Sequence, residues 1–236
     1  SKVPIMNSAG GTEVSGSILH CCLHRPFKVG SFNAPIPGMS ADILNLDGQK
    51  VSTNEMGELV MRKSSIGLTK SLWNDDKRYI DNYWSVIKDY WVHGDLASRD
   101  ADGHWYLHGR SDDTIKVSGK RIGPSELESV IVKSGKAKEV AAVGIPDANK
   151  GSKIILSIVP AENNDQKESF FEDLVIKDLG KSFKPDKVIF VKDLPKTRNM
   201  KIMRRVIKSC LANQDPGDLS TLLNPESVEE IRSHAI

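Results

Sequence analysis

One stretch of the chain, residues 91–128, combines isolated charges with the turn signals that would display them. Asp102-Gly103 is a tight-turn signal between two strand-like runs, so the stretch is predicted to begin as a β-hairpin. Gly94-Asp95 and Gly109-Arg110 are expected at strand ends, where groups that contact ligands are usually displayed. We therefore expect this stretch to take part in whatever chemistry the chain performs. The histidines within it, His93, His104 and His108, are expected on the hairpin surface.

Composition limits the classes of partner. The chain has 236 residues, 39% of them hydrophobic, which suffices for one large domain or two smaller ones. Its 33 Lys and Arg against 31 Asp and Glu give a net charge of +2. This balance argues against a nucleic-acid-binding protein but leaves room for small phosphate-bearing ligands. Neither a signal peptide nor an apolar run of about 20 residues is present, so no membrane span is expected.

The cysteines predict a reducing compartment. Their number is odd, three, so they cannot form a disulfide framework, and a cytoplasmic location is expected. The segment His20–His24, HCCLH, superficially suggests a metal site. Adjacent cysteines on a strand point to opposite faces, and no second ligand pair follows at zinc-site spacing. We interpret GSILHCCL as a buried strand.

The pattern of elements changes near residue 110. The preceding part is predicted to be β-rich, with strands at 41–46 and 57–61 and one short helix at 75–84 that Asn74 or Asp75 caps. From about residue 113 onward strands and helices alternate. Strands are expected at 114–117, 140–145, 154–159 and 188–191, and helices from Pro124, at 170–179, 200–211 and 225–233. The predicted fold class is α+β.

Several motifs, in a fixed order, resemble one family. They are GDLASRDADG, GRSDDTIKVSGKRIGPSELE, EVAAVGIPD and LPKTRNMKIMRR. Together they resemble the C-terminal third of the acyl-adenylate-forming enzymes, which include acyl-CoA synthetases, luciferases and the adenylation domains of peptide synthetases. The tail DPGDLSTLLNPESVEE is most similar to acetyl-CoA synthetase-like, AMP-forming enzymes.

The resemblance implies two domains. Residues 1–111 would be the C-terminal, β-rich part of the large AMP-binding domain, and residues 112–236 the small mobile C-terminal domain. The Ser/Thr/Gly-rich loop that grips the ATP phosphates in this family is not in the sequence. The chain is therefore expected to be a C-terminal fragment that is inactive by itself.

The resemblance also implies a nucleotide site in the first domain. Thr12 would meet the α-phosphate of ATP, and Glu13 would help to hold Mg²⁺, for which oxygen ligands are suited. Asp95 would accept hydrogen bonds from the ribose hydroxyls. Arg110 would make a second contact to ribose and phosphate. Without the family context, GGTE predicts an ordinary loop and Asp95 a turn acid.

In the second domain, the resemblance implies residues that act at different steps. Asp112 would be the hinge, and Ser118 and Gly119 would form the turn whose backbone approaches the pantetheine of CoA. Arg121 would meet the adenylate phosphate in the thioester-forming arrangement; the alternative for it is a solvated basic residue. Lys201 would enter the active site during adenylation, as the last residue of the family's PKTRSGK pattern, and begin a helix.

Two departures from the family pattern bear on these roles. Asn199-Met200 stands where the family usually has Ser-Gly, and losing the glycine restricts the dihedral angles of the loop before Lys201. Gly10 stands where acetate-specific enzymes carry a tryptophan that closes the acyl pocket, which predicts acids longer than acetate.

The basic residues that follow Lys201 have another interpretation. Arg204, Arg205 and Lys208 are expected to form a solvated basic helix face.

The predicted function is that of an AMP-forming acyl-CoA synthetase, an acid–thiol ligase that uses a carboxylate, ATP and CoA. Two alternatives stay open. One is an adenylating enzyme that loads the thiol of a carrier protein. The other is a non-catalytic module that binds a nucleotide or a partner.

Overall fold

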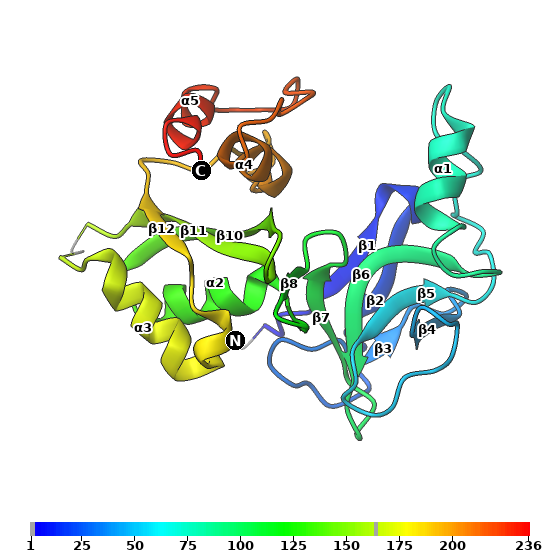
Figure 1. The fold of residues 1–236 in the computed structure, drawn as a ribbon. Coiled ribbons are helices and arrows are strands. Elements are labelled where there is room, and N and C mark those ends of the chain that lie inside the picture. The colour runs from blue at the N-terminus through cyan, green and yellow to red at the C-terminus, as the bar shows by residue number, and fades with distance from the viewer. Residues whose placement is uncertain (1–2, 163–164) are drawn as a thin grey trace. The chain divides into compact units, whose positions relative to one another are not determined.

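The computed structural model describes residues 3–162 and 165–236, and they form two compact units (Figure 1). The first unit ends at Asp112 and the second begins at Asp113. Each unit has its own apolar core and is described by itself.

The first unit consists of two antiparallel sheets and one short helix. A three-stranded sheet has the order β1-β2-β3, and a four-stranded sheet has the order β4-β5-β6-β7. The strands are β1 (Ser8–Gly11), β2 (Gly16–His20), β3 (Ala34–Pro35), β4 (Ala41–Leu44), β5 (Gly57–Met61), β6 (Trp91–Arg99) and β7 (Trp105–Arg110). The 3₁₀ turn η1 (Thr12–Val14) follows β1, and α1 (Asp76–Tyr83) precedes β6. Trp91, Trp105 and Met61 are buried between these elements.

Local sequence explains the turn and the cap in this unit. The Asp102-Gly103 hairpin turn is confirmed: Gly103 has a positive φ of 83°, and the Asp100 carboxylate accepts the amides of Asp102 and His104 at 3.0 and 2.9 Å. Asp75 caps α1 by accepting the amide of Arg78 at 3.1 Å. These short-range interactions depend on residue type alone, which is why the sequence predicts them.

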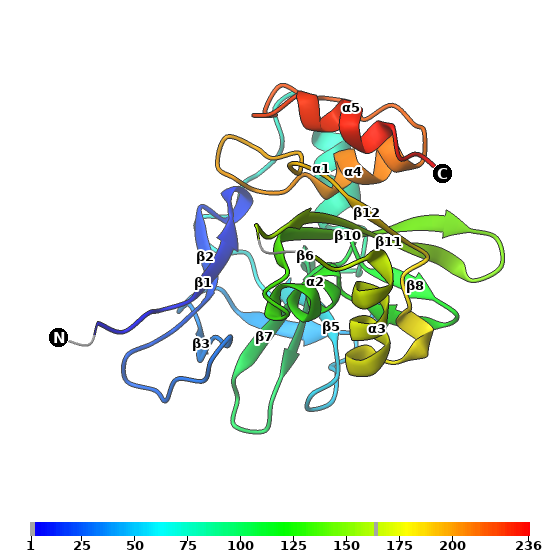
Figure 2. The ribbon, with the colours of Figure 1, turned by 90° about the vertical axis from the view of Figure 1, so that its left-hand side faces the viewer.

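The second unit is a three-stranded sheet covered by helices on both faces, with a small hairpin at one side (Figures 1 and 2). Its sheet has the order β10-β11-β12; β10 and β11 are antiparallel, whereas β11 and β12 are parallel. The strands are β8 (Ile115–Val117), β9 (Lys120–Ile122), β10 (Ala137–Asp147), β11 (Gly151–Pro160) and β12 (Lys187–Phe190). The helices are α2 (Pro124–Lys133), α3 (Glu168–Leu179), the 3₁₀ turn η2 (Lys181–Phe183), α4 (Arg204–Leu211) and α5 (Glu226–Arg232).

Alternation along β10 places apolar side chains on both faces of this sheet. Val140 and Ala142 belong to the core under α2 and α3, whereas Ala141 and Val143 belong to the core under α4 and α5. A strand buried on both faces needs a nearly continuous apolar run, which is what the sequence contains. The predicted α+β class is confirmed.

Helix α2 begins and ends where its sequence signals indicate. Pro124 occupies the first turn, and the Glu126 carboxylate accepts the amide of Gly123 at 3.2 Å. Leu127, together with Val130 and Ile131, faces the core. Gly135, with φ of 71°, follows the last turn.

Three predictions about local structure are wrong. The helix expected at 200–211 begins only at Arg204, because Met200 has a positive φ of 61° and the chain turns back on itself between Lys196 and Ile202. Gly94-Asp95 does not end a strand. It lies inside β6, since pairing with β7 continues from Asp95 to Arg99. The strand expected over 16–23 ends at His20, before both cysteines.

None of the helices within the described residues has the length and apolar character that crossing a membrane requires.

We predict that Leu127→Ala destabilises the second unit by about 2–5 kcal/mol, because the fully buried side chain leaves a cavity between α2 and β10. Val132→Ala, on the exposed side of the same helix, is the matched control and should change stability by less than about 0.5 kcal/mol. Helical circular dichroism during urea unfolding reports mainly on α2–α5. All 4 tryptophans lie in the first unit, so their fluorescence reports on that unit. Equal effects of the two substitutions would contradict the assigned packing.

Candidate functional site

In the first unit, the predicted nucleotide residues gather around the middle of β6. Asp95 on β6 and Arg110 on β7 are cross-strand partners, and their carboxylate and guanidinium approach to 4.0 Å. The Arg110 guanidinium also donates to the carbonyl of His93 at 3.0 Å and contacts the Asp112 carboxylate at 3.3 Å. Strand pairing therefore holds Asp95 and Arg110 together, as an acceptor beside a fork of donors.

Gly94 leaves room on β6 for the side chain of Arg110. It has φ of 82°, and a Cβ at this position would lie 2.7 Å from the Arg110 guanidinium. Any other residue would thus be strained and would also push Arg110 away. The glycine before Asp95 belongs to the site for this reason.

His93 is part of this cluster, although sequence reasoning placed it on the surface. It is only 7% exposed, its ring packs 5.4 Å from that of Trp91, and its Nε2 lies 3.2 Å from the Asp95 carboxylate. Burial lowers the pKa of His93, against the attraction of Asp95 and Glu13 and with the repulsion of Arg110. The alternation of residues 91, 93 and 95 on one strand face is the signal that could have revealed it.

The surface assignment is also wrong for the other two histidines of the hairpin. His104 is 5% exposed, and its Nε2 lies 3.0 Å from the carbonyl of Pro26. His108 is half-buried and shares a hydrogen bond of 2.8 Å with Ser98. The loop at Pro26 contacts the His104 ring and strand β6 contacts the His108 ring, and such contacts cannot be read from the hairpin's own periodicity.

Thr12 and Glu13 lie in η1, directly after β1. Thr12 is exposed and Glu13 is half-buried. A Cβ on Gly11 would lie 3.1 Å from the Glu13 carboxylate and 3.2 Å from the His93 ring, so Glu13 and His93 face the same point of β1. Burial raises the pKa of the Tyr83 phenol, and the Glu13 carboxylate raises it further. Thr12 and Glu13 thus belong to the same region as Asp95.

A cleft of about 270 Å³ opens beside these residues. Its lining includes Tyr83, His93, Gly94, Arg110 and Ser111. The Tyr83 ring stacks on Trp91 at 5.2 Å with an interplanar angle of 2°. The cleft therefore offers an aromatic wall, one guanidinium and the carboxylates of Glu58, Asp81 and Asp112, which suits a flat, polar ligand that both donates and accepts hydrogen bonds.

The single carboxylate of Glu13 fits a magnesium ion whose other ligands are water and phosphate oxygens. Within the described residues, no three or more His, Cys, Asp and Glu side chains form a cluster that could hold a metal ion. Mg²⁺ is commonly bound by one or two carboxylates and completes its octahedron with water and phosphate oxygens. Glu13 can supply one such ligand.

Gly10 is required by the packing of its own sheet. A Cβ at Gly10 would lie 2.0 Å from the Gly16 carbonyl oxygen and 2.5 Å from the Ser17 Cα. The register of β1 and β2 shifts at this point, which brings the two backbones close. Strand packing therefore requires glycine at position 10 whatever the size of the acyl group.

In the second unit, Ser118 and Gly119 form the two-residue turn between β8 and β9. Both have positive φ, 49° and 81°, the geometry of a tight hairpin turn. Both are exposed, and a Cβ at Gly119 would meet no atom within 4 Å. Arg121 is exposed on β9, opposite Lys116. This hairpin can therefore present bare backbone and a cation to a ligand.

Lys201 lies at an exposed turn, three residues before α4. The turn is closed by the amide of Thr197, which donates to the Lys201 carbonyl at 2.9 Å, and by the Lys201 amide, which donates to Thr197 Oγ1 at 3.2 Å. Met200 takes the left-handed conformation that glycine would adopt without strain. The substitution of Met for Gly therefore leaves the turn intact in this structure.

A cavity of about 520 Å³ adjoins Lys201. Arg198 and Lys201 line it from the turn, and Ser220 and Thr221 line it from the tail. Thr197 bridges to Leu222, which brings the two segments side by side. Two cations and several hydroxyls suit an anionic group.

The expected solvated basic face of α4 is only partly present. Arg204 makes a two-pronged ion pair with Glu128 of α2, at 2.9 and 2.7 Å, and Arg205 donates to the carbonyls of Pro216 and Asp218. Lys208 is exposed. The tertiary fold thus uses the arginines to join segments that are distant in sequence.

The comparisons with known proteins agree with the motifs. Residues 126–201 match the family described as AMP-binding enzyme C-terminal domain. The acetyl-coenzyme A synthetase of Methanothrix thermoacetophila is 38% identical over 237 residues, which cover 98% of this chain and 36% of that protein. The acetyl-coenzyme A synthetase of Helicobacter pylori is 38% identical over 247 residues, which cover 99% of this chain and 37% of that protein. The chain thus spans little more than a third of the relatives that it matches.

Structural comparison gives the same fold. The acetoacetyl-CoA synthetase from Streptomyces lividans superposes with a TM-score of 0.86 at 22% identity, over 97% of this chain and 35% of that one. The predicted resemblance to the C-terminal part of the AMP-forming acyl-CoA synthetases is confirmed. The roles of single residues stay predictions.

We predict that acid weakens the first unit through His93. Because the folded state lowers the pKa of His93, the unfolded chain binds the proton more tightly, and stability is lost as the pH falls below about 6.5. His93→Gln should lose less stability between pH 7.5 and 5.5 than the unchanged chain, as measured by tryptophan fluorescence in urea. His24→Gln, at an exposed position, is the control and should leave the pH dependence unchanged. If the His93 variant lost more stability on acidification than the unchanged chain, the predicted direction of the effect would be wrong.

Proposed function

Because the chain is related along its length to the C-terminal part of the AMP-forming acyl-CoA synthetases, we propose that it performs part of their reaction. A carboxylate, ATP and CoA are converted to acyl-CoA, AMP and pyrophosphate through an acyl-adenylate. The observation that carries the proposal is Lys201, which is exposed at a closed turn beside a cavity that suits anions. The full-length enzyme, not this chain alone, is expected to be active.

In the first half-reaction, an oxygen of the carboxylate attacks the α-phosphorus of ATP and pyrophosphate leaves. Two anions have to approach each other for this step. The compact ammonium of Lys201 neutralises charge between them, which lowers the barrier. Thr12 contacts the α-phosphate, and Asp95 and Arg110 hold the ribose.

The cleft beside Asp95 supports the nucleotide part of this proposal. Asp95 and Arg110 are paired by the register of β6 and β7, and the stacked ring of Tyr83 forms a wall nearby. Holding the ribose on β6 and β7 would fix the position of the attached α-phosphate, so that the carboxylate can approach it in the right geometry. When bound, Mg²⁺ would neutralise charge on the phosphate oxygens, with Glu13 as one ligand.

In the second half-reaction, the CoA thiolate attacks the acyl carbon and AMP leaves. Gly119 and Ser118 offer backbone that the pantetheine arm can approach closely, and Arg121 contacts the adenylate phosphate. Asp112, exposed at the boundary between the two units, is the proposed hinge between the half-reactions. Residues 1–111 and 112–236 are thus the proposed domains.

CoA is the proposed thiol, and the cytoplasm the proposed location. Relatives named as coenzyme A synthetases favour CoA over the thiol of a carrier protein. Cys21, Cys22 and Cys210 are all free thiols, which fits a reducing compartment. Thioester formation with free CoA distinguishes the two thiols.

We predict that Lys201→Gln in the full-length enzyme slows acid-dependent ATP–pyrophosphate exchange by about 10²–10³-fold, because the charge between the two anions is lost. Thioester formation from added acyl-adenylate should change less than about twofold, since Lys201 acts only in the first step. Lys208→Gln, on the exposed side of α4, is the control. Equal losses in both half-reactions would rule out the assigned role.

We predict that the full-length enzyme prefers a short- to medium-chain acid longer than acetate, because Gly10 replaces a pocket-closing tryptophan. Rates with a series from acetate to hexanoate, each at saturating ATP and CoA, measure the preference. The matched relatives are named for the acetyl group, and Gly10 is also required by the pairing of β1 with β2. A strong preference for acetate would therefore leave strand packing as the reason for this glycine.

A further inference from the structure

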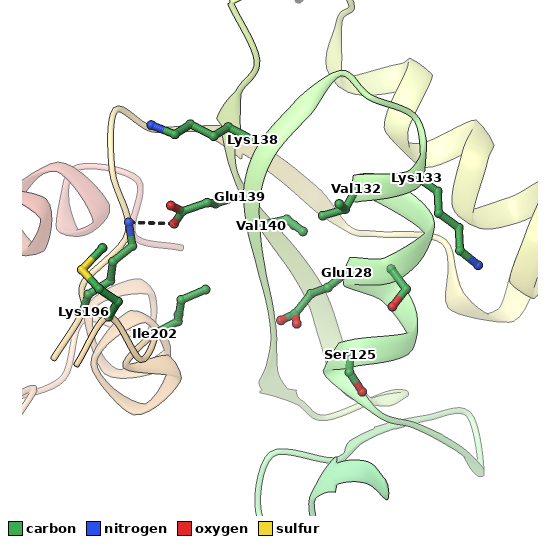
Figure 3. Close-up of a pocket in the computed structure, with 11 residues that line it drawn as sticks. Ser125, Glu128, Val132, Lys133, Lys138, Glu139, Val140, Lys196 and Ile202 are labelled. Atoms are coloured by element: carbon green, nitrogen blue, oxygen red, sulfur yellow. Dashed lines mark ion pairs between the residues drawn. The ribbon is translucent and has the colours of Figure 1, made fainter. Parts of the chain in front are cut away.

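Lys196 is a buried cation at the base of the turn that carries Lys201. Only 5% of the residue is exposed. Its ammonium donates to Asp193 Oδ1 at 2.6 Å and lies 2.7 Å from Glu139 Oε2, the ion pair drawn in Figure 3. Burial pulls the pKa of Lys196 down, but the two carboxylates outweigh it and the pKa is raised. A buried charge with two such partners is costly to disturb, because removing it leaves like charges facing each other.

The same point is tied to the tail of the chain through the backbone. The Lys196 amide donates to Asn224 Oδ1 at 3.0 Å, and the Lys196 carbonyl accepts the amide of Leu223 at 2.8 Å. Asn224 also donates to Asp193 Oδ2 at 2.7 Å. Strand β10, the turn and the tail thus meet at one residue.

The tip of the turn, at Met200, has hydrogen bonds only within the turn, whereas Thr197 is bridged to Leu222 of the tail. A groove of about 550 Å³ separates α2 and β10 from the segment that contains Met200 and Ile202 (Figure 3). Met200 lines this groove and is 59% exposed. Because no described residue of the second unit fills the groove, the position of the turn depends on its base at Lys196 and on its bridge to the tail.

We propose that Lys196, held by Glu139 and Asp193, is a positioning residue that sets where the Lys201 ammonium lies during adenylation. The inference rests on the proposed function for its catalytic consequence. Its structural part does not, because it concerns only contacts within the second unit. The network acts through the turn and does not touch the substrate.

The structural part is tested by hydrogen exchange on this chain. Lys196→Met keeps the length of the side chain and removes the charge, so the amides of Thr197, Met200 and Met203, which close the turn and its base, should exchange at least about tenfold faster. Lys196→Arg should restore most of the protection, since it keeps the cation. Lys138→Met is the control, because Lys138 lines the same groove on β10 and is exposed. Unchanged protection in the Lys196→Met chain would overturn the proposal.

The catalytic part is tested in the full-length enzyme. Lys196→Met should lower kcat of ATP–pyrophosphate exchange by roughly 10–100-fold, the effect of misplacing a catalytic group by about 1 Å. KM for ATP and the thioester step from added acyl-adenylate should change less than about twofold. Glu139→Gln and Asp193→Asn, each of which leaves Lys196 one carboxylate, should give smaller losses confined to the same half-reaction.

Three results separate the hypotheses. Equal losses in both half-reactions, or normal exchange kinetics in the Lys196→Met enzyme, would overturn the positioning role. Absence of exchange activity from the unchanged full-length enzyme would instead refute the proposed function. In that event, loss of amide protection in the Lys196→Met chain would still support Lys196 as the residue that holds the turn.

Discussion

The three-stranded sheet of the second unit has apolar side chains on both faces, and the arrangement of that unit depends on covering both. Helices α2 and α3 cover one face, and α4 and α5 cover the other. Since α4 lies on this face over β10, the segment between β12 and α4 crosses from β12, at one edge of the sheet, to β10, at the other, where Lys196 pairs with Glu139. The turn with Lys201 is the exposed part of this crossing. Burial of a sheet thereby dictates where Lys201, the proposed catalytic cation, is displayed.

Ion pairs join segments of the second unit that its apolar cores have brought together. Glu128 of α2 and Arg204 of α4 join the two helical layers through a two-pronged ion pair, and Lys196 joins the turn to β10. Burial of such pairs contributes little net stability compared with apolar residues of the same size. Their directional geometry instead selects one position for each segment. This explains why positions in a helix or loop that the sequence marks as basic are partly enclosed in the fold.

In the first unit, strand pairing holds an acid, Asp95, and an arginine, Arg110, beside each other on the sheet. Pairing of β6 with β7 sets Asp95 opposite Arg110, and Gly94 leaves room for the guanidinium. His93 and Trp91, on the same strand face as Asp95, form the buried support beneath it. The Asp95 carboxylate thus has the His93 ring at 3.2 Å on one side and the Arg110 guanidinium at 4.0 Å on the other.

The sequence alone determined the features that depend on neighbouring residues. The hairpin turn at Asp102-Gly103, the cap at Asp75 and the start of α2 at Pro124 follow from turn and cap chemistry, which acts over a few residues. The motifs likewise indicated the family. Only the tertiary structure decided the burial of His93, the turn that delays α4 to Arg204 and the enclosure of Lys196. Those features depend on contacts between segments far apart in the chain, such as Lys196 with Glu139 and Asn224. Hydrophobic periodicity cannot reveal such contacts, because it reports which face of an element is buried and not what covers it.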